Sequence, residues 1–446
     1  MAQIVKKSIF DSRSTVIDYT VDQRGALEKI LQWGESTAQF FLLSGYAGTG
    51  KTTIAENIAE YYRADVMAPT NAAVKRLKEK IKCNTTGFST LHSALYGGPD
   101  PKTGEFIKSK GLIYKRTYIV DECSMIEQQV LLDLISAAKA SKSKIIFMGD
   151  NFQLEPVGKD PQIFAWEKTH MDFKEEWKYT LYEVKRNDGA ILKAATHLRT
   201  VCEPNLLYQE NSEFNIVRKF STDLVDDITN NKNYVVLTST NNKRLEYNRL
   251  IRGVRYKEEA SNLVMNFEKV IAIANTIYSN GEQYVIRDPV ILETFSREVD
   301  MGKPNQPDYK FYKFVFIEHK IETDDEKEKE KLFRTLLIAD LDKPSLHPAI
   351  LLKLNSFRFD NRFTVDVEYG RKTVKAWNPN VIISTYGYAT STHKAQGQEW
   401  DYVYINADWL SDAWDKARWL YTAITRAKVK VEIKQAYTYR VVQDGK

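Results

Sequence analysis

The stretch Gly45-Tyr46-Ala47-Gly48-Thr49-Gly50-Lys51-Thr52 decides the fold of this chain. It matches the pattern GxxxxGK[ST], with an apolar run before it (39–44) and a helical pattern after it (52–62). In such a strand-loop-helix unit, glycines let backbone N–H groups curl around phosphate oxygens at a helix N-terminus. Lys51 is expected to reach the terminal phosphates and Thr52 to hold a magnesium ion. The sequence therefore predicts a nucleotide site formed by Gly45, Ala47, Gly48, Thr49, Gly50, Lys51, Thr52 and Thr53.

Strand-like and helical patterns alternate on both sides of this loop. A helix is expected at 22–33, capped by Asp22, and another at 72–81; further strands are expected at 66–69, 117–120 and 144–148. A second alternation begins with a strand at 235–238 and a helix at 241–252, and it resumes at Val381. We therefore predict an α/β protein with two parallel-sheet lobes, each with its site at the carboxyl ends of the strands.

Two segments interrupt the alternation. The run GGPDPKTGEFIKSKG within 95–115 is rich in Gly, Pro and Lys and is typical of a protruding β-hairpin. Many short β-like runs between 270 and 379 indicate a small all-β insertion. The expected organisation is a first lobe at 1–85 and 115–190, a hairpin at 86–114, a second lobe at 191–270 and 380–446, and a β insertion at 271–379.

Polar residues that follow two of the predicted strands are candidates for catalysis. Asp121 and Glu122 end an apolar strand, where Asp121 would hold the magnesium ion and Glu122 would deprotonate the attacking water. Gln153 follows the next strand and is placed to contact the γ-phosphate or that water. The alternative interpretations are two solvated acids at a strand end for the carboxylates and an ordinary surface turn for Gln153.

Two arginines are candidates for a finger that offsets charge on the γ-phosphate. Arg186 lies in the segment EVKR, and Arg426 lies in AITR near the end of the chain. A surface ion pair is the alternative for either arginine, and it would be accepted for Arg186 taken alone. Gln23, ahead of the first strand, has an amide that suits an adenine edge.

Bulk composition narrows the class of protein. The net charge of +5 is only mildly basic, so it is compatible with nucleic acid without arguing for it. The three cysteines, Cys83, Cys123 and Cys202, are far apart and form no CxxC pair, which fits a reducing compartment and no zinc site. No apolar run approaches the roughly 18 residues of a membrane span, and the N-terminus lacks the apolar stretch of a signal peptide. A cytoplasmic protein without a membrane partner is therefore expected, in the host cell if the chain is encoded by a phage.

The ordered set of motifs resembles that of superfamily 1 helicases, in the RecD/Dda-like branch, and in length and layout it is most similar to phage Dda helicases. After Gln23 and GYAGTGKTT come APTNAA (68–73), STLHS (89–93), DECSM (121–125), GDNFQLEPV (149–157), EVKR, STHKAQGQEWD (391–401) and YTAITRAK (421–428). The resemblance covers both lobes, about three quarters of the chain. Tyr46 departs from it, since the family often has Pro there, and Asn71 stands where the phage helicase has His.

The resemblance implies two RecA-like lobes and roles that spacing alone does not give. Contacts to single-stranded DNA would come from Thr70, Asn71, Thr90, His92, His393 and Lys394. A satisfied buried histidine is the alternative for His92 and His393. Gln396, Gly397 and Glu399 would join the second lobe to the nucleotide. The hairpin around Phe106 would be a pin that splits the duplex, and the β insertion would be an SH3-like domain.

The expected function is that of a monomeric ATP- and Mg²⁺-dependent DNA helicase in replication or recombination, which moves 5′ to 3′ on single-stranded and forked DNA. A single-strand-binding protein and replication proteins are candidate partners. One rival is a translocase that displaces bound proteins without opening duplexes. A second rival is a nucleotide-dependent switch or small-molecule kinase, which would need neither the segment HKAQGQE nor a second sheet.

Overall fold

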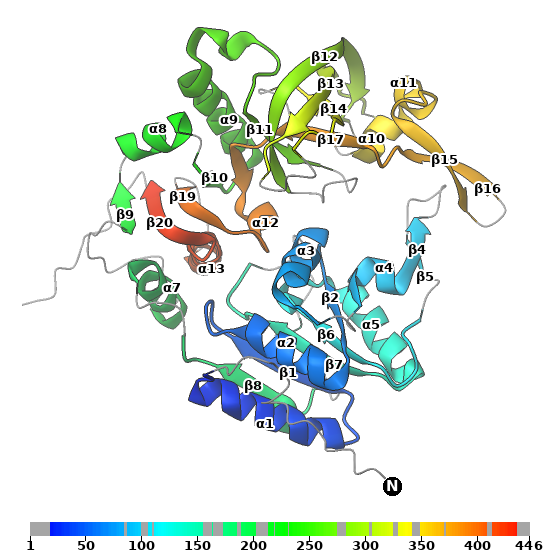
Figure 1. Ribbon diagram of the computed structural model, residues 1–446, viewed down its shortest axis with the longest axis vertical. Helices are drawn as coiled ribbons and strands as arrows, with labels where there is room; N and C mark the ends of the chain where they lie inside the picture. Colours follow the sequence, from blue (N-terminus) through cyan, green and yellow to red (C-terminus); the bar gives the residue numbers. More distant parts are fainter. Residues whose placement is uncertain are drawn as a thin grey trace, which may run out of the picture. The chain divides into compact units, whose positions relative to one another are not determined.

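The computed structural model divides the chain into two compact units, 1–207 with 412–425 and 208–411 with 426–446. Each unit contains a parallel sheet (Figure 1). The residues that the structure describes are 18–83, 87–99, 106–108, 111–154, 163, 173–184, 189–201, 213–217, 219–230, 232–273, 282–302, 306–323, 329–340, 348–369, 372–407 and 413–434.

The sheet of the first unit has six parallel strands in the order β3-β2-β6-β7-β1-β8. Their bounds are β1 Phe40–Gly45, β2 Asp65–Ala68, β3 Phe88–Thr90, β6 Thr117–Val120, β7 Lys144–Gly149 and β8 Lys178–Leu181. The helices of this unit are α1 Val21–Glu35, α2 Lys51–Tyr62, α3 Asn71–Lys80, α4 Leu91–Leu95, α5 Gln128–Ser141, α7 Ala190–Val201 and α13 Ala413–Ile424, with short 3₁₀ turns at Cys123–Met125 and Glu175–Trp177.

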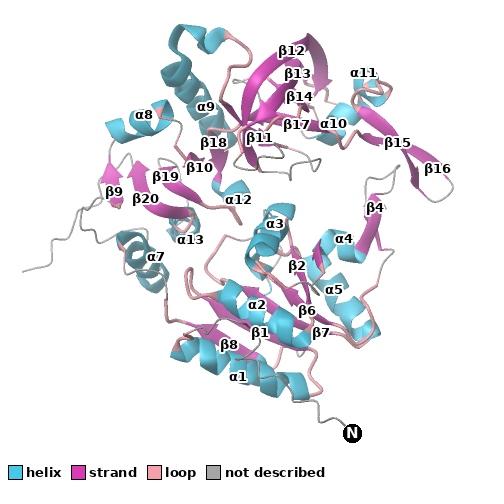
Figure 2. Cartoon of the chain, in the orientation of Figure 1, coloured by secondary structure: helices cyan, strands magenta, loops and turns pink. Residues whose placement is uncertain are grey.

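Apolar residues alternate along the strands and build a core on each face of this sheet. Phe41 and Leu43 of β1 pack in one cluster with α1, α2 and α3, whereas Phe40 and Leu42 pack in the other with α4 and α5. The helices therefore cover both faces of the sheet (Figure 2). Since all six strands are parallel, the loops that follow β1, β2, β6 and β7 emerge at the same edge, as predicted.

The expected hairpin is present between α4 and β6. Strands β4 (Tyr96–Pro99) and β5 (Phe106–Lys108) pair antiparallel, with Pro99 opposite Phe106. The residues between the two strands lie outside the described part of the chain.

The second unit has a five-stranded parallel sheet in the order β18-β10-β19-β20-β9. Its elements are β9 Phe214–Val217, α8 Thr222–Thr229, β10 Tyr234–Thr238, α9 Asn241–Tyr256, a 3₁₀ turn Lys257–Ser261, β18 Ala389–Ser391, α12 Thr392–Ala395, β19 Trp400–Asn406 and β20 Ala427–Lys434. The two parallel-sheet lobes predicted from the alternation are thus confirmed.

The β insertion of the second unit is a closed barrel of five strands in the order β11-β12-β13-β14-β17. These are β11 Glu268–Ala272, β12 Gln283–Asp300, β13 Tyr309–Ile321, β14 Phe333–Ile338 and β17 Val381–Tyr386, and the two longest curve across the barrel (Figure 1). Between β14 and β17 the chain adds α10 Pro348–Lys353, α11 Asn355–Arg358 and a hairpin of β15 Thr364–Tyr369 with β16 Lys372–Trp377.

Three boundaries differ from the expected ones. The strand at 381–386 does not resume the parallel sheet; it closes the barrel between β11 and β14. Helix α7 and residues 412–425, both expected in the second lobe, belong to the first unit, where α13 packs against α7. Finally, helix α1 begins at Val21 and is capped by Thr20 rather than by Asp22, because the Thr20 hydroxyl accepts a hydrogen bond from Gln23 N–H.

Candidate nucleotide site and strand-binding residues

The predicted phosphate loop joins the buried strand β1 to the first turn of α2. Gly48 and Gly50 have φ values of +82° and +80°, and such backbone is costly for residues with a Cβ. At Gly50 a Cβ would also lie 2.3 Å from Gln23 Nε2. Lys51 Nζ donates to the carbonyl oxygens of Gly45 and Tyr46 at 2.8 and 2.9 Å. The lysine ammonium thus lies over the loop, where the terminal phosphates of a nucleotide would replace these carbonyl contacts.

Helix α1 supports this loop through Gln23. The Gln23 side chain accepts from Thr20 N–H at 3.1 Å, and its Nε2 donates to the Thr49 carbonyl at 2.9 Å. Asp22, which does not cap the helix, instead accepts the backbone N–H groups of Tyr182 and Glu183 at 2.7 and 2.8 Å. The first turn of α1 therefore ties the phosphate loop to the end of β8, and the proposed adenine contact of Gln23 stays a prediction.

Asp121 and Glu122 follow β6 and are both buried. Burial raises the pKa of Asp121, and the charge of Glu122 raises it further, whereas Arg76 and Lys51 oppose the shift. Arg76 Nη2 lies 2.8 Å from Glu122 Oε1 and 3.6 Å from Asp121 Oδ2. The buried acid pair is thus partly compensated by a guanidinium from α3, which sequence reasoning did not identify. Its position in the helix after APTNAA was the available signal.

Gln153 is 4% exposed in the turn after β7. Its Oε1 has no hydrogen-bond partner among the described residues. A buried carbonyl oxygen without a donor is costly in a folded protein. This atom can accept a hydrogen bond from a water molecule, and the role of Gln153 at the γ-phosphate stays a prediction.

The residues of the first unit that are candidates for binding single-stranded DNA lie at one edge of its sheet. Thr70 follows β2, and Thr90 is the last residue of the neighbouring β3. Their hydroxyls cap α3 and α4 by accepting from Ala73 and Ser93 N–H at 3.2 and 3.1 Å. Asn71 is the first residue of α3. His92 lies on α4, half-buried, with its ring 5.5 Å from that of Tyr96.

Two further sequence candidates are Arg186 and Phe106. Arg186 lies outside the described residues. Phe106 is the first residue of β5 and pairs with Pro99 of β4.

The candidates for binding single-stranded DNA in the second unit, His393 and Lys394, lie on α12. Surrounding protein desolvates the Lys394 ammonium although part of the side chain is exposed, and this desolvation lowers its pKa, with a smaller contribution from the positive charge of Arg244. An anion such as a phosphate close to Lys394 would favour the charged form of its ammonium. Arg244, on α9, was not identified from the sequence.

Arg426 lies beside the segment HKAQGQE within the second unit. Its Nη1 donates to the Gln398 carbonyl at 3.4 Å, and its own carbonyl accepts Trp400 N–H at 2.9 Å. Gly397 has a φ of +79°, which a glycine adopts without strain and which turns the chain between α12 and β19. Gly397, Glu399 and Arg426 therefore lie on neighbouring segments of the second unit.

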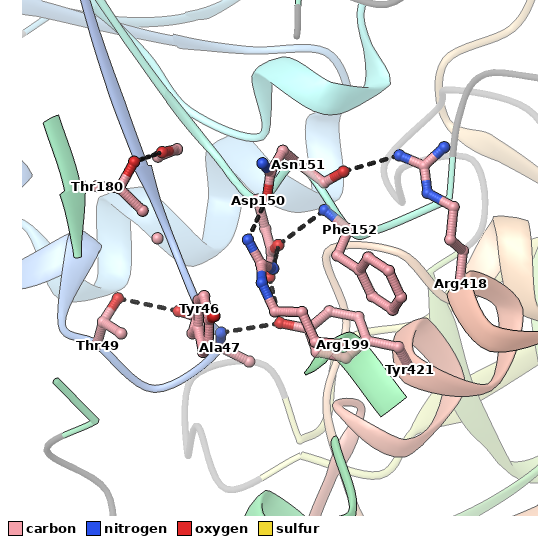
Figure 3. A network of polar contacts seen from close by, with 12 residues as sticks. Tyr46, Ala47, Thr49, Asp150, Asn151, Phe152, Thr180, Arg199, Arg418 and Tyr421 are labelled. Carbon is pink, nitrogen blue, oxygen red and sulfur yellow. Dashed lines mark hydrogen bonds and ion pairs between the residues drawn. The ribbon is translucent and has the colours of Figure 1, made fainter. Parts of the chain in front are cut away.

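A second network surrounds Asp150, at the end of β7, and it was not identified from the sequence either. Arg199 of α7 and Tyr421 of α13 both contact the Asp150 carboxylate (Figure 3). Both helices were expected in the other lobe, so no motif linked these residues to the phosphate loop.

The fold and this set of side chains define a P-loop nucleoside triphosphatase with two parallel-sheet units. Two family models match the chain, an AAA domain at residues 18–213 and a UvrD-like helicase C-terminal domain at residues 386–433. Both models, together with the similarity to Dda and RecD helicases, support a superfamily 1B helicase of the RecD- and Dda-like branch.

Individual relatives cover different shares of the chain. An uncharacterized protein, R530 of Acanthamoeba polyphaga mimivirus, is 24% identical over 93% of this chain and 99% of its own length. The ATP-dependent DNA helicase dda of Enterobacteria phage T4 is 31% identical over 42% of this chain and 43% of its own length, so the chain spans less than half of that helicase. A solved structure of two coordinating Pif1 helicases at forked duplex DNA has a TM-score of 0.50 at 15% identity and covers 96% of this chain and 95% of that one, which supports the fold.

No helix in the described part of the chain is both long and apolar enough to cross a membrane.

Proposed function

We propose that this chain is an ATP-driven motor that moves 5′ to 3′ along single-stranded DNA and unwinds the duplex ahead of it. The observation that carries the proposal is the convergence of Lys51, the Asp121-Glu122 pair and Gln153 at the carboxyl edge of one parallel sheet. A second parallel-sheet unit, with Arg426 beside HKAQGQE, supplies what a switch or small-molecule kinase would not need.

Magnesium fits the residues between α2 and β6. Thr52 offers a hydroxyl oxygen in the first turn of α2, and Asp121 offers a buried carboxylate at the end of β6. Mg²⁺ prefers such oxygen ligands together with nucleotide phosphates and water. Because burial and Glu122 disfavour the charged form of Asp121, a divalent cation would stabilise that carboxylate. Held there by Thr52 and Asp121, the ion would supply positive charge that offsets the charge developing on the phosphates during hydrolysis.

Glu122 and Gln153 are assigned to the attacking water. The Glu122 carboxylate would accept a proton from the water, and the unpartnered Gln153 Oε1 would accept the other hydrogen and orient it. Arg76, 2.8 Å from Glu122, fixes the position of that carboxylate. Lys51 would hold the terminal phosphates in place.

Arg426 and Arg186 are assigned to the γ-phosphate. A guanidinium there offsets charge in the transition state and contributes roughly 10³- to 10⁵-fold to the rate in related phosphoryl-transfer systems. Since Arg426 belongs to the second unit, its approach to the nucleotide would close the two units on ATP, and hydrolysis would release them. This cycle would move a monomer along the strand by about one nucleotide per ATP, by analogy with other motors of this fold.

Single-stranded DNA would be bound in the first unit at the sheet edge where β2 and β3 end, and in the second unit at α12. Thr70, Asn71, Thr90 and His92 would contact it in one unit, and His393 and Lys394 in the other. Each base-pair step holds about 1.4 kcal/mol of stacking, and aromatic platforms offer roughly 1–3 kcal/mol per base. These energies are of similar size, so a firm grip competes with reannealing while the β4–β5 hairpin splits the fork.

The direction of movement is tested with two forks of identical sequence, one with only a 5′ tail and one with only a 3′ tail. With ATP and Mg²⁺, we expect strand separation on the 5′-tailed substrate and none on the 3′-tailed one. Unwinding of the 3′-tailed substrate alone would contradict the proposed polarity. ATP hydrolysis with both substrates, but without strand separation on either, would favour a translocase that does not open duplexes.

A further inference from the structure

The turn after β7 carries a carboxylate that is completely buried. Asp150 has no exposed surface, and its Oδ1 accepts Phe152 N–H at 3.0 Å. The remaining partners are the Arg199 guanidinium, which forms an ion pair with Oδ1, and the Tyr421 hydroxyl, which donates to Oδ2. A buried charge is tolerated only when it is paired and hydrogen-bonded in this way. Asp150 therefore depends on residues from α7 and α13.

Arg199 also contacts the tip of the phosphate loop. Its guanidinium carbon lies 4.0 Å from the centroid of the Tyr46 ring, and its Nη2 donates to Asn151 Oδ1. A flat guanidinium stacks on an aromatic face while it binds a carboxylate at its edge, and lysine cannot do both. Tyr46, at the tip of the phosphate loop, thus supplies the aromatic face on which Arg199 stacks.

Tyr421 makes a second connection to the same loop. Its hydroxyl accepts Ala47 N–H at 3.1 Å while it donates to Asp150 (Figure 3). The Tyr421 ring also packs edge-on against Phe152, with 5.2 Å between the ring centroids. One hydroxyl thus joins the phosphate loop to the turn after β7.

Helix α13 is held along this turn by two more hydrogen bonds. Thr422 Oγ1 accepts Leu154 N–H at 2.9 Å, and Arg418 Nη2 donates to the Asn151 carbonyl at 2.8 Å. The turn includes Gln153, and α13 ends at Ile424, two residues before Arg426. The network therefore connects the phosphate loop both to Gln153 and to the segment that leads to Arg426.

We propose that Arg199 and Tyr421 are positioning residues for ATP hydrolysis: they hold Tyr46 and Ala47 to Asp150, so that the conformation of the phosphate loop sets the position of Gln153. The inference rests on the proposed function, because Gln153 acts there on the attacking water. Neither Arg199 nor Tyr421 is required to touch the nucleotide.

The effect should fall on turnover and spare ground-state binding. Lys51 and the amides of the loop from Gly48 to Thr52 remain in place when the network is cut, so ADP should still bind. Cutting the network should weaken the contacts with the γ-phosphate and the attacking water, and these contacts act during hydrolysis rather than during ADP binding.

The test uses Tyr421→Phe and Arg199→Lys in the full chain, with Tyr404→Phe as a matched control. Tyr404 is a buried tyrosine of the second unit whose hydroxyl donates to Asp227 at 2.6 Å, so the control removes the same kind of bond at a site away from the phosphate loop. Steady-state ATPase with single-stranded DNA gives kcat and KM, and a fluorescent ADP analogue gives Kd. Thermal melting of each variant reports folding.

Each of the two test variants should lower kcat about tenfold, with the Kd for ADP within about twofold of that of the wild type. The kcat of the double variant should be only slightly lower than that of the more impaired single variant, because both residues act through Asp150. Tyr404→Phe should reduce the melting temperature without lowering kcat.

Three results would overturn the inference. They are an unchanged kcat in Tyr421→Phe and Arg199→Lys, a parallel loss of kcat and ADP affinity, and an effect on kcat that Tyr404→Phe reproduces. A wild-type chain that binds ADP but does not turn over ATP would overturn the proposed function and this inference with it, whereas the first three results leave the proposed function intact.

Discussion

Arg76 Nη2 lies 2.8 Å from Glu122 Oε1, so the carboxylate assigned to the attacking water is held by a guanidinium from the neighbouring helix α3. Arg76 also faces Asp121, whose pKa is raised by burial and by Glu122. Arg76 therefore faces both acids, and Lys51 also favours the charged form of Asp121.

Glu122→Gln should stop hydrolysis and retain nucleotide binding. The amide keeps the shape of the side chain but cannot take a proton from water, and general-base catalysis of this kind contributes about 10²- to 10⁴-fold. Single-turnover ATP hydrolysis and binding of a fluorescent ATP analogue measure the two properties separately. A Glu122→Gln variant with wild-type turnover would assign the base elsewhere.

Lys51→Ala should abolish ATP hydrolysis while single-stranded DNA still binds. The lysine ammonium is removed from the phosphates, whereas the residues that end β2 and β3 are untouched. ATPase assays and fluorescence anisotropy with a labelled oligonucleotide check the two effects. Normal hydrolysis by this variant would show that the phosphate loop is not the catalytic site.

Replacement of residues 97–111 by a short glycine linker should abolish unwinding and retain DNA-stimulated ATPase. The hairpin of β4 and β5 projects from the sheet after α4 and contributes no residue to the phosphate loop or to the acid pair. Fork unwinding and ATPase are measured on the same preparation. If unwinding persists at the wild-type rate, another part of the chain separates the strands.

His319 should make the barrel sensitive to acid. Burial lowers the pKa of His319 from 6.5 to about 4, although its hydrogen bond with the Lys320 carbonyl opposes the shift. Between these pH values the unfolded chain binds a proton that the folded chain does not, so stability is full above pH 6.5 and falls as the pH drops toward 4. The loss is limited to about 3 kcal/mol for this one group.

The measurement is chemical denaturation of the wild type and of His319→Phe between pH 4 and 7. The variant has no imidazole to titrate, so its stability should fall less steeply with acid, even if it is less stable overall because Thr335 Oγ1 loses its 2.9 Å partner. Equal slopes for the two proteins would show that the pKa of His319 is the same in the folded and the unfolded chain.

The sequence predicted those parts of the fold whose signal is local. The strands at 40–45, 117–120 and 144–149 and the helix after Lys51 lie within one residue of their expected ends, because apolar runs and glycines mark them directly. The acid pair and Gln153 were found in the same way, from their positions after strands.

The parts that were missed depend on contacts distant in sequence. The segment 381–386 is as apolar as a core strand of a parallel sheet, and only its pairing with β11 and β14 shows that it closes a barrel. Similarly, α13 precedes a strand of the second sheet, yet its bonds to Ala47, Asn151 and Leu154 place it in the first unit. Arg199 was overlooked for the same reason, because its partners Tyr46 and Asp150 are distant from it in the sequence.

The most direct test of the account is the ATPase of Arg426→Ala with single-stranded DNA present. The account holds that ATP is hydrolysed between a phosphate loop in one unit and an arginine carried by the other. It predicts a loss of roughly 10³- to 10⁵-fold in kcat, with the Kd for ADP changed by no more than about threefold. A variant that turns over ATP at the wild-type rate would contradict it.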